Sequence, residues 1–273
     1  MMRHIQIDSI SVRNAKTSCT VQPALYADAL CRSEQDSRMG NVLERSGNMS
    51  KFICIFCDER KNASDAHIIN NHIGICDNCY KKLNKTAPGR PFKGYRNISY
   101  VISPFEYTSR LRDTILKFKF DNQWAIASLF ADMMQEHLDT YGDALGEFDY
   151  IVPVPLHKKR FLERGYNQSE MIAKYIADRN GIIMRTDILK RIRATEKQSK
   201  LKGINRALNV KDAFLCEENI DGKKIILFDD VCTTGGTLRS CADALADAGA
   251  EKICALTLAI AIHFEDKKPQ IMY

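Results

Sequence analysis

Two neighbouring carboxylates and a loop of threonines and glycines form the most chemically informative stretch of this sequence. The apolar run Lys224–Phe228 predicts a strand, Asp229 and Asp230 follow it, and a helix is expected from Thr237. In open parallel sheets, ligands bind where strands end. Threonine hydroxyls, backbone N–H groups left accessible by glycine and a helix N-terminus all suit a phosphate. The loop residues are Thr233, Thr234, Gly235, Gly236 and Thr237.

The carboxylates narrow down which phosphate compound this site would take. Two adjacent acids repel a bare phosphate, whereas ribose hydroxyls donate hydrogen bonds to carboxylate oxygens and Mg²⁺ reduces the negative charge. Asp229 and Asp230 therefore predict a sugar phosphate as the ligand. The sequence around them is neither a Walker A loop nor a GxGxxG turn. A tight turn without a ligand is the alternative, and the acidic pair at the strand end argues against it.

Four of the ten cysteines are arranged as two pairs with metal-ligand spacing, Cys54 with Cys57 and Cys76 with Cys79. A two-residue spacer lets both thiolates of a pair meet one ion, and two pairs complete a tetrahedral set typical of zinc or a simple iron site. Disulfides, a redox pair, or a histidine between the pairs replacing one thiolate are the alternatives. A segment this small builds little core, so we expect chelation to unfold it and leave the larger domain folded.

Basic residues gather in two further stretches. The first, His157–Arg164, follows a strand that ends in two prolines, and its cations suit a pyrophosphate or a nucleic-acid backbone, unless it is an exposed basic loop. The second, residues 191–201 with Arg206 and Asn209 beyond, has the composition of a mobile lid or of a solvated connector. The candidate contact residues are Lys158, Arg160, Arg164 and Arg206.

The elements that must position these residues alternate between strands and helices. Strands are predicted at residues 99–102, 150–154, 182–184, 224–228 and 252–262. Helices are predicted at residues 110–138, 169–179 and 237–248. Short, continuous apolar strands separated by helices predict an α/β fold, with a parallel sheet covered on both faces.

The composition is that of an ordinary globular protein, with 45% apolar and 27% charged residues in a chain of 273. The longest apolar run, Ile253–Ile262, is too short to cross a bilayer, and no secretory signal is evident. We therefore expect a cytoplasmic protein without membrane insertion. The net charge of +6 suits a polyanionic partner or simply a solvated surface.

The chain divides by composition into four parts. Residues 1–48 are polar and aperiodic, and Met49 opens what looks like a fresh start, so 1–48 are expected to be a disordered extension or a start-site artefact. Residues 52–83 carry the cysteine pairs, residues 84–98 have linker composition, and residues 99–265 form the larger predicted domain.

The stretch Lys224–Thr237 resembles the phosphoribosyl-pyrophosphate motif of type I phosphoribosyltransferases, although Phe228 and Cys232 stand where aliphatic residues are commoner. The resemblance implies that Asp229 and Asp230 hold the ribose 2′- and 3′-hydroxyls and are the catalytic residues. It implies that the loop from Thr233 wraps the 5-phosphate.

The order of motifs along residues 52–262 resembles the ComF family of competence-associated proteins. That order is two CxxC pairs, a Lys-rich helix, the run Pro153–Leu156, the run Arg164–Gln168, a polar segment and the phosphate loop. The resemblance implies a zinc-ribbon domain with structural zinc, joined to a type I phosphoribosyltransferase domain that binds phosphoribosyl pyrophosphate with Mg²⁺. It also implies a link to natural transformation.

Two functions from different classes are compatible with this resemblance. One is a glycosyltransferase that displaces pyrophosphate from phosphoribosyl pyrophosphate, with an acceptor and a general base that the sequence does not identify. The other is a single-stranded DNA-binding protein of the DNA-uptake machinery, whose phosphoribosyl site binds or senses a ligand without turnover.

Overall fold

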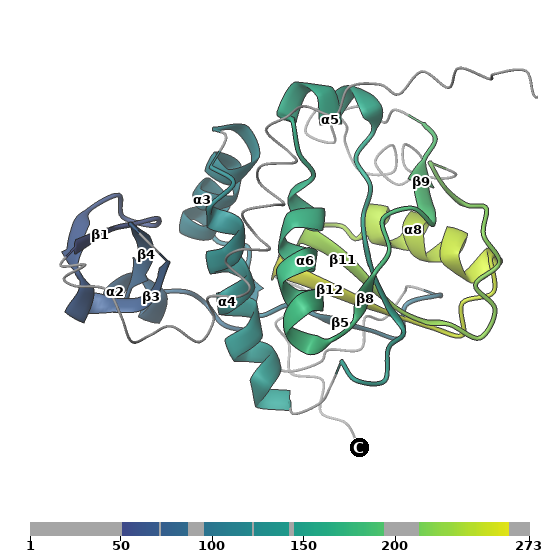
Figure 1. Ribbon diagram of the computed structural model, residues 1–273, viewed down its shortest axis with the longest axis horizontal. Coiled ribbons are helices and arrows are strands. Elements are labelled where there is room, and N and C mark those ends of the chain that lie inside the picture. Colours follow the sequence, from purple (N-terminus) through teal and green to yellow (C-terminus); the bar gives the residue numbers. More distant parts are fainter. Residues whose placement is uncertain are drawn as a thin grey trace, which may run out of the picture.

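A parallel sheet of six strands lies at the centre of the larger part of the chain (Figure 1). The structure, a computed structural model, describes residues 51–70, 72–86, 96–121, 123–141, 145–193 and 213–261. The strand order is β5-β12-β11-β7-β8, and β6 also pairs with β12. The strands are β5 (Tyr100–Ile102), β6 (Phe105–Glu106), β7 (Tyr150–Pro153), β8 (Ile183–Met184), β11 (Lys224–Cys232) and β12 (Lys252–Ile260).

Helices cover both faces of this sheet, as predicted. On one side lie α3 (Ser109–Phe120), α4 (Ile126–Leu138) and α6 (Gln168–Asn180), and on the other lies α8 (Gly236–Asp247). The side chains of β11 alternate between the two cores. Ile226 and Phe228 pack with the first group of helices, whereas Ile225 and Leu227 pack with α8. Because both faces are buried, the strand is apolar at every position from Ile225 to Phe228.

The predicted helix at residues 110–138 is wrong in one respect, because two helices occupy that range. Asp121 ends α3, with its N–H donating to the Lys117 carbonyl at 2.9 Å, and α4 begins at Ile126. The predicted helix at 169–179 is confirmed as α6, which ends at Gly181 with a left-handed φ of 65°. The helix predicted at 237–248 is confirmed as α8.

A short helix and a pair of strands were not predicted. The basic stretch after β7 forms the short helix α5 (Lys158–Arg164) rather than a loop, and it ends at Gly165 with φ 80°. The antiparallel pair β9 (Leu189–Arg191) and β10 (Phe214–Cys216) lies on the α8 side of the sheet. The pair flanks residues 194–212, which lie outside the described residues and include most of the predicted lid of residues 191–201, with Arg206 and Asn209.

The cysteine-containing segment folds as a small sheet of its own with the order β2-β1-β4-β3. It consists of β1 (Lys51–Cys54), β2 (Arg60–Asn62), β3 (Ala66–Asn70), β4 (Ile73–Cys76) and α2 (Asp77–Lys81). We call residues 51–83 the cysteine module. Figure 1 shows α3 and α4 between this module and the central sheet. Its apolar residues and those of α3, α4 and α6 belong to one continuous hydrophobic cluster.

Two sequence predictions concern residues that the structure does not describe. The extension 1–48 lies wholly outside the described residues, as does most of the predicted linker, residues 87–95. None of the helices in the described ranges is long and apolar enough to cross a membrane.

Candidate functional site

The acidic pair lies on β11, the strand between β7 and β12 at the middle of the sheet. Pairing with β7 ends at Phe228, opposite Pro153, whereas pairing with β12 continues to Cys232. Asp229 and Asp230 therefore lie inside the strand rather than after it, which extends the predicted strand of residues 224–228. Their side chains project where β7 has already stopped, so one flank of each carboxylate is open to partners from other elements.

The loop after β11 leads directly into α8. Gly235 has a left-handed φ of 68° and precedes the first helical residue, Gly236. Glycine adopts this conformation at little cost, which is why the turn can be this tight. The first N–H groups of a helix have no partner within it and carry partial positive charge, so this end of α8 can receive an anion. The predicted phosphate-binding residues Thr233 to Thr237 line one small hollow together with Asp229.

Asp229 is held by two hydrogen bonds to the same oxygen. The Ser169 hydroxyl donates to Asp229 Oδ1 at 3.0 Å, and the Asp230 backbone N–H donates to it at 2.9 Å. Burial raises the pKa of Asp229 above its ordinary value and the charge of Asp230 raises it further, while Lys119 and Ser169 act in the opposite direction. Without a ligand, this carboxyl group is therefore easier to protonate than an exposed aspartate.

Asp230 is buried and forms an ion pair with Lys119, which lies near the end of α3. Arg164, at the end of α5, lies near enough for its charge to interact with that of Asp230. Sequence reasoning missed both Lys119 and Ser169 as site residues. Neither has a distinctive spacing to the acidic pair, because α3 and α6 reach it only through the tertiary fold.

The run Arg164–Gln168 connects α5 to α6, and its side chains form hydrogen bonds that fix the position of α6 next to the acidic pair. Asn167 caps α6 by accepting from the Ser169 N–H at 3.2 Å, and its amide donates to the Val154 carbonyl at 3.1 Å. The Tyr166 hydroxyl donates to the carbonyl of Phe118 in α3. Gln168 is buried, and its side-chain oxygen accepts no hydrogen bond from the described residues. Such an atom beside Ser169 is typical of a site completed by a ligand or water.

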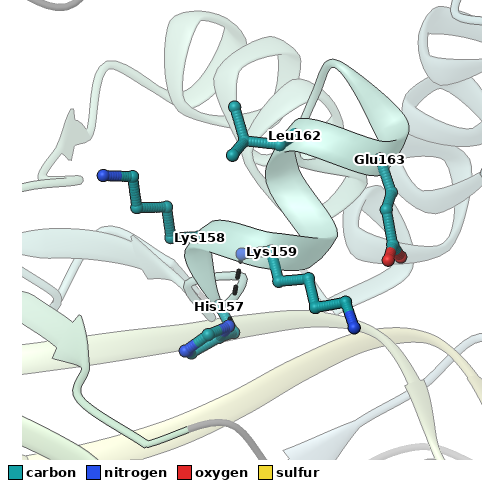
Figure 2. Close-up of a pocket in the computed structure, with 5 residues that line it drawn as sticks. All are labelled: His157, Lys158, Lys159, Leu162 and Glu163. Atoms are coloured by element: carbon teal, nitrogen blue, oxygen red, sulfur yellow. Dashed lines mark hydrogen bonds between the residues drawn. The ribbon is translucent and has the colours of Figure 1, made fainter.

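The basic residues predicted to contact a ligand lie on two different faces of α5. Arg160 and Arg164, one helical turn apart, are half-buried, and the charges of both interact with other charged groups around the acidic pair. Lys158 and Lys159 are exposed, and Figure 2 shows them lining an open hollow with His157, Leu162 and Glu163. The fourth candidate, Arg206, lies outside the described residues.

The beginning of the predicted lid is structured. Arg191 is the last residue of β9, and its guanidinium lies 5.2 Å from the ring centre of Phe214 in β10. Arg191 also interacts electrostatically with Asp229. The structure thus brings the first residue of the predicted lid into the neighbourhood of the acidic pair.

The four paired cysteines come together in the cysteine module. The sulfur atoms of Cys54, Cys57, Cys76 and Cys79 all lie within 4.8 Å of one another. Four sulfurs at about 2.3 Å from one tetrahedral ion are separated by about 3.8 Å, so the cluster fits a four-thiolate metal site. His67 is not a ligand, because its ring stacks on Tyr80 and its nitrogens face Asp77 and Glu136.

Comparison with known proteins agrees with this architecture. A family model described as phosphoribosyl transferase domain matches residues 168–270. DNA utilization protein YhgH of Salmonella typhi is 31% identical over 192 residues, which are 69% of this chain and 85% of that protein. The chain belongs to the ComF family.

Two further ComF relatives match over nearly their whole length. Competence protein F of Haemophilus influenzae is 29% identical over 76% of this chain and 96% of its own. Competence protein ComFC of Bacillus subtilis is 28% identical over 79% of this chain and 98% of its own. The ComF fold of this chain thus combines a phosphoribosyltransferase-type domain with an N-terminal cluster of four cysteines.

Proposed function

We propose that this ComF protein binds phosphoribosyl pyrophosphate together with Mg²⁺ at the acidic pair and the loop that follows it. The observation that carries the proposal is the geometry of β11 and α8. Two carboxylates lie where the β7 pairing ends, and a Thr/Gly loop beside them opens into a helix N-terminus. Asp229 and Asp230 would hold the ribose hydroxyls, and Thr233 to Thr237 the 5-phosphate.

Hard oxygen ligands and a surplus of negative charge fit a divalent cation here, which would neutralise the leaving pyrophosphate when bound. The phosphate oxygens of the pyrophosphate would be bound by Arg160, Arg164 and Lys119. In the transfer reaction, a nucleophilic atom of the acceptor forms a bond to C1 while the bond from C1 to the pyrophosphate oxygen breaks. The electron pair leaves with pyrophosphate, and the acceptor releases its proton to solvent.

Two further features belong to the same proposal. Zinc is the expected ion in the cysteine module, since four thiolates at tetrahedral spacing favour it. A cytoplasmic location would keep these thiolates reduced and supply phosphoribosyl pyrophosphate.

Isothermal titration calorimetry with phosphoribosyl pyrophosphate and Mg²⁺ tests the central proposal. We expect the wild type to bind and the Asp229→Ala/Asp230→Ala double variant to lose at least a hundredfold in affinity. Asp178→Asn, which removes an exposed ion-paired carboxylate from α6, is the matched control and should bind as the wild type. Absence of binding by the wild type would refute the proposal.

A second candidate function is binding of single-stranded DNA without turnover. The outer face of α5 favours it, because exposed Lys158 and Lys159 flank Leu162, which is 72% exposed. Phe120, 64% exposed, lies beside the guanidinium of Arg164. Cations next to exposed apolar and aromatic side chains suit a nucleic acid strand with unstacked bases. The relatives' names refer to DNA utilization and competence.

The two faces of α5 allow the functions to be separated. Lys158→Gln/Lys159→Gln should weaken single-stranded DNA binding and lower the slope of log K against log salt by about 1.4, while leaving phosphoribosyl pyrophosphate binding unchanged. Arg164→Gln should mainly weaken phosphoribosyl pyrophosphate binding. Gel shifts over a salt series, run beside an assay of pyrophosphate release with a panel of amines and bases, measure both. DNA binding without any release of pyrophosphate would favour the second function, binding of single-stranded DNA without turnover.

A further inference from the structure

Helix α3 contacts the cysteine module along one side. The Arg110 guanidinium donates to the sulfur of Cys79 at 3.1 Å. The Thr114 hydroxyl lies 3.3 Å from the Ile55 carbonyl and 3.2 Å from the Arg110 carbonyl of its own helix, and its one proton is shared between them. Lys117 forms an ion pair with Asp58, with 2.8 Å from its nitrogen to Oδ1. Residues four and then three positions apart share one face of a helix, so these three contacts form a single stripe.

The partners of this stripe belong to the turn that gathers the thiolates. Ile55 lies between Cys54 and Cys57, and Asp58 follows Cys57 with a left-handed φ of 60°. The Asp58 N–H donates to the Cys54 carbonyl at 2.8 Å, which closes the turn. A metal ion held by both cysteines would fix this turn, and with it the groups that α3 contacts.

Charge favours the same contacts. Four thiolates around a divalent ion leave a net charge of about −2 on the cluster. Arg110 is the cation that touches a cluster sulfur, and Lys117 pairs with the acid next to the cluster. The metal-bound form of the module is therefore the one that attracts α3 most strongly.

The other end of α3 supports the acidic pair. Lys119 pairs with Asp230. Phe118 is buried against the rings of Phe130 and Tyr166, at 5.8 and 5.7 Å between centres, and its carbonyl accepts the Tyr166 hydroxyl. Tyr166 leads directly into α6, whose Ser169 donates to Asp229. Both carboxylates thus have a partner whose position depends on the last turn of α3.

We propose that the metal-bound cysteine module acts as a brace that holds α3, and through Lys119 and Tyr166 holds the acidic pair, in its ligand-binding geometry. A helix moves as a rigid rod, and Lys119, nine positions after Arg110, lies about 13.5 Å further along the axis. A shift of α3 on the module is therefore transmitted to the far end. The proposal rests on the proposed function for the identity of the ligand, phosphoribosyl pyrophosphate. The coupling of the cysteine module to the acidic pair through α3 does not depend on that function.

Variants of the stripe test the brace, and only Arg110 among the changed residues contacts a cysteine of the cluster. Thr114→Val/Lys117→Met removes two of the three contacts, and Arg110→Gln removes the third. Lys174→Met breaks a similar surface pair on α6 and is the matched control. We expect wild-type metal content in all variants, and a loss of fivefold or more in affinity for phosphoribosyl pyrophosphate with Mg²⁺ in the stripe variants alone, by calorimetry.

Hydrogen exchange of the α3 amides provides a readout that needs no ligand. In the stripe variants, amides of residues 115–120 should exchange faster than in the wild type and in Lys174→Met. Unchanged exchange in folded stripe variants overturns the brace, whatever the ligand result. Faster exchange with unchanged affinity also overturns it, because α3 would then not govern the site. If the wild type binds no phosphoribosyl pyrophosphate, the proposed function fails and the exchange result alone decides the brace.

Discussion

At the scale of single residues, the site is a balance of charge between Asp229, Asp230 and Lys119. Lys119 pairs with the buried Asp230, its charge also acts on Asp229, and burial raises the pKa of Asp229. A ligand that brings ribose hydroxyls and Mg²⁺ favours the charged form of both acids. Binding of such a ligand must therefore be linked to release of a proton.

The pH dependence of binding follows from this linkage. Below the raised pKa of Asp229 the ligand must displace a proton, so affinity for phosphoribosyl pyrophosphate with Mg²⁺ should rise with pH by up to about tenfold per unit. Above that pKa the dependence on Asp229 should end. Asp229→Asn should bind more weakly but lose this part of the pH dependence, while the ligand's own titration remains in both proteins. Calorimetry in buffers of different ionisation enthalpy counts the protons released.

Asp229 also makes the unliganded protein less stable at higher pH. Its pKa in the folded state is above the unfolded value of about 3.9, so its contribution is fully present below that pH and is lost as pH rises through the folded pKa. Urea unfolding should therefore show a fall in stability over this window. Asp229→Asn should flatten the profile, and an equal fall in that variant would contradict the assignment.

Lys119 should matter for folding as well as for binding. Lys119→Met leaves Asp230 buried without its ion-pair partner, so the free energy of unfolding should drop by about 1–3 kcal/mol at neutral pH. Lys174→Met, which breaks an exposed pair, should cost less than about 1 kcal/mol. Chemical denaturation of both variants gives the comparison, and equal losses would mean that the Asp230 pair is screened like a surface pair.

At the scale of elements, the turns that end the helices set where the strands of the sheet begin. Gly249, between α8 and β12, has φ 100°, and a Cβ there would come within 3.0 Å of the Asp221 Cα. Gly181, between α6 and β8, also has a positive φ of 65°, but nothing lies within 4 Å of its Cβ position. Gly249 is thus required both by its left-handed backbone conformation and by the lack of room for a Cβ. Gly181 is required by its backbone conformation alone.

This difference can be measured with two alanine substitutions. Gly181→Ala should cost about 1–2 kcal/mol of stability, the ordinary penalty for a left-handed residue with a Cβ. Gly249→Ala should cost more, because the new methyl group also presses on backbone that cannot swing aside as a side chain does. Urea denaturation of the two variants tests the order. A smaller loss for Gly249→Ala would show that the turn after α8 relaxes.

At the scale of the whole molecule, the cysteine module is joined to the larger domain by more than a linker. The Tyr80 hydroxyl donates to Glu136 of α4 at 2.6 Å, and the Asn70 amide donates to Ser128 at 2.7 Å. The apolar residues of the module continue into the core around α3 and α4. This continuity revises the expectation that chelation would unfold the module alone.

We therefore expect loss of metal and loosening of the α3–α4 region to occur together. The single tryptophan, Trp124, lies between these two helices and reports on them by fluorescence. In a thermal or urea titration, metal release to a coloured chelator should coincide with the change in Trp124 fluorescence. Release that is complete well before any fluorescence change would show that the module unfolds independently.

Much of the fold and site was predictable from local sequence. The buried strand Lys224–Phe228, the glycine stop of α6 and the inward residues of α8 follow from periodicity and turn chemistry. The phosphate loop and the cysteine pairs are predictable because all their groups lie within a few residues of one another. The helix break after Phe120 and the helical form of α5 were not, because both stretches are short and polar.

What the sequence by itself determined is the local chemistry, namely the acidic pair, the loop into α8 and two thiolate pairs of matching spacing. What only the tertiary structure decided is which distant groups meet them. Lys119 reaches Asp230 from α3, Ser169 reaches Asp229 from α6, and Arg110 reaches Cys79. Local motifs depend on spacing along the chain, whereas these contacts depend on how helices pack across a buried sheet, which no short window of sequence records.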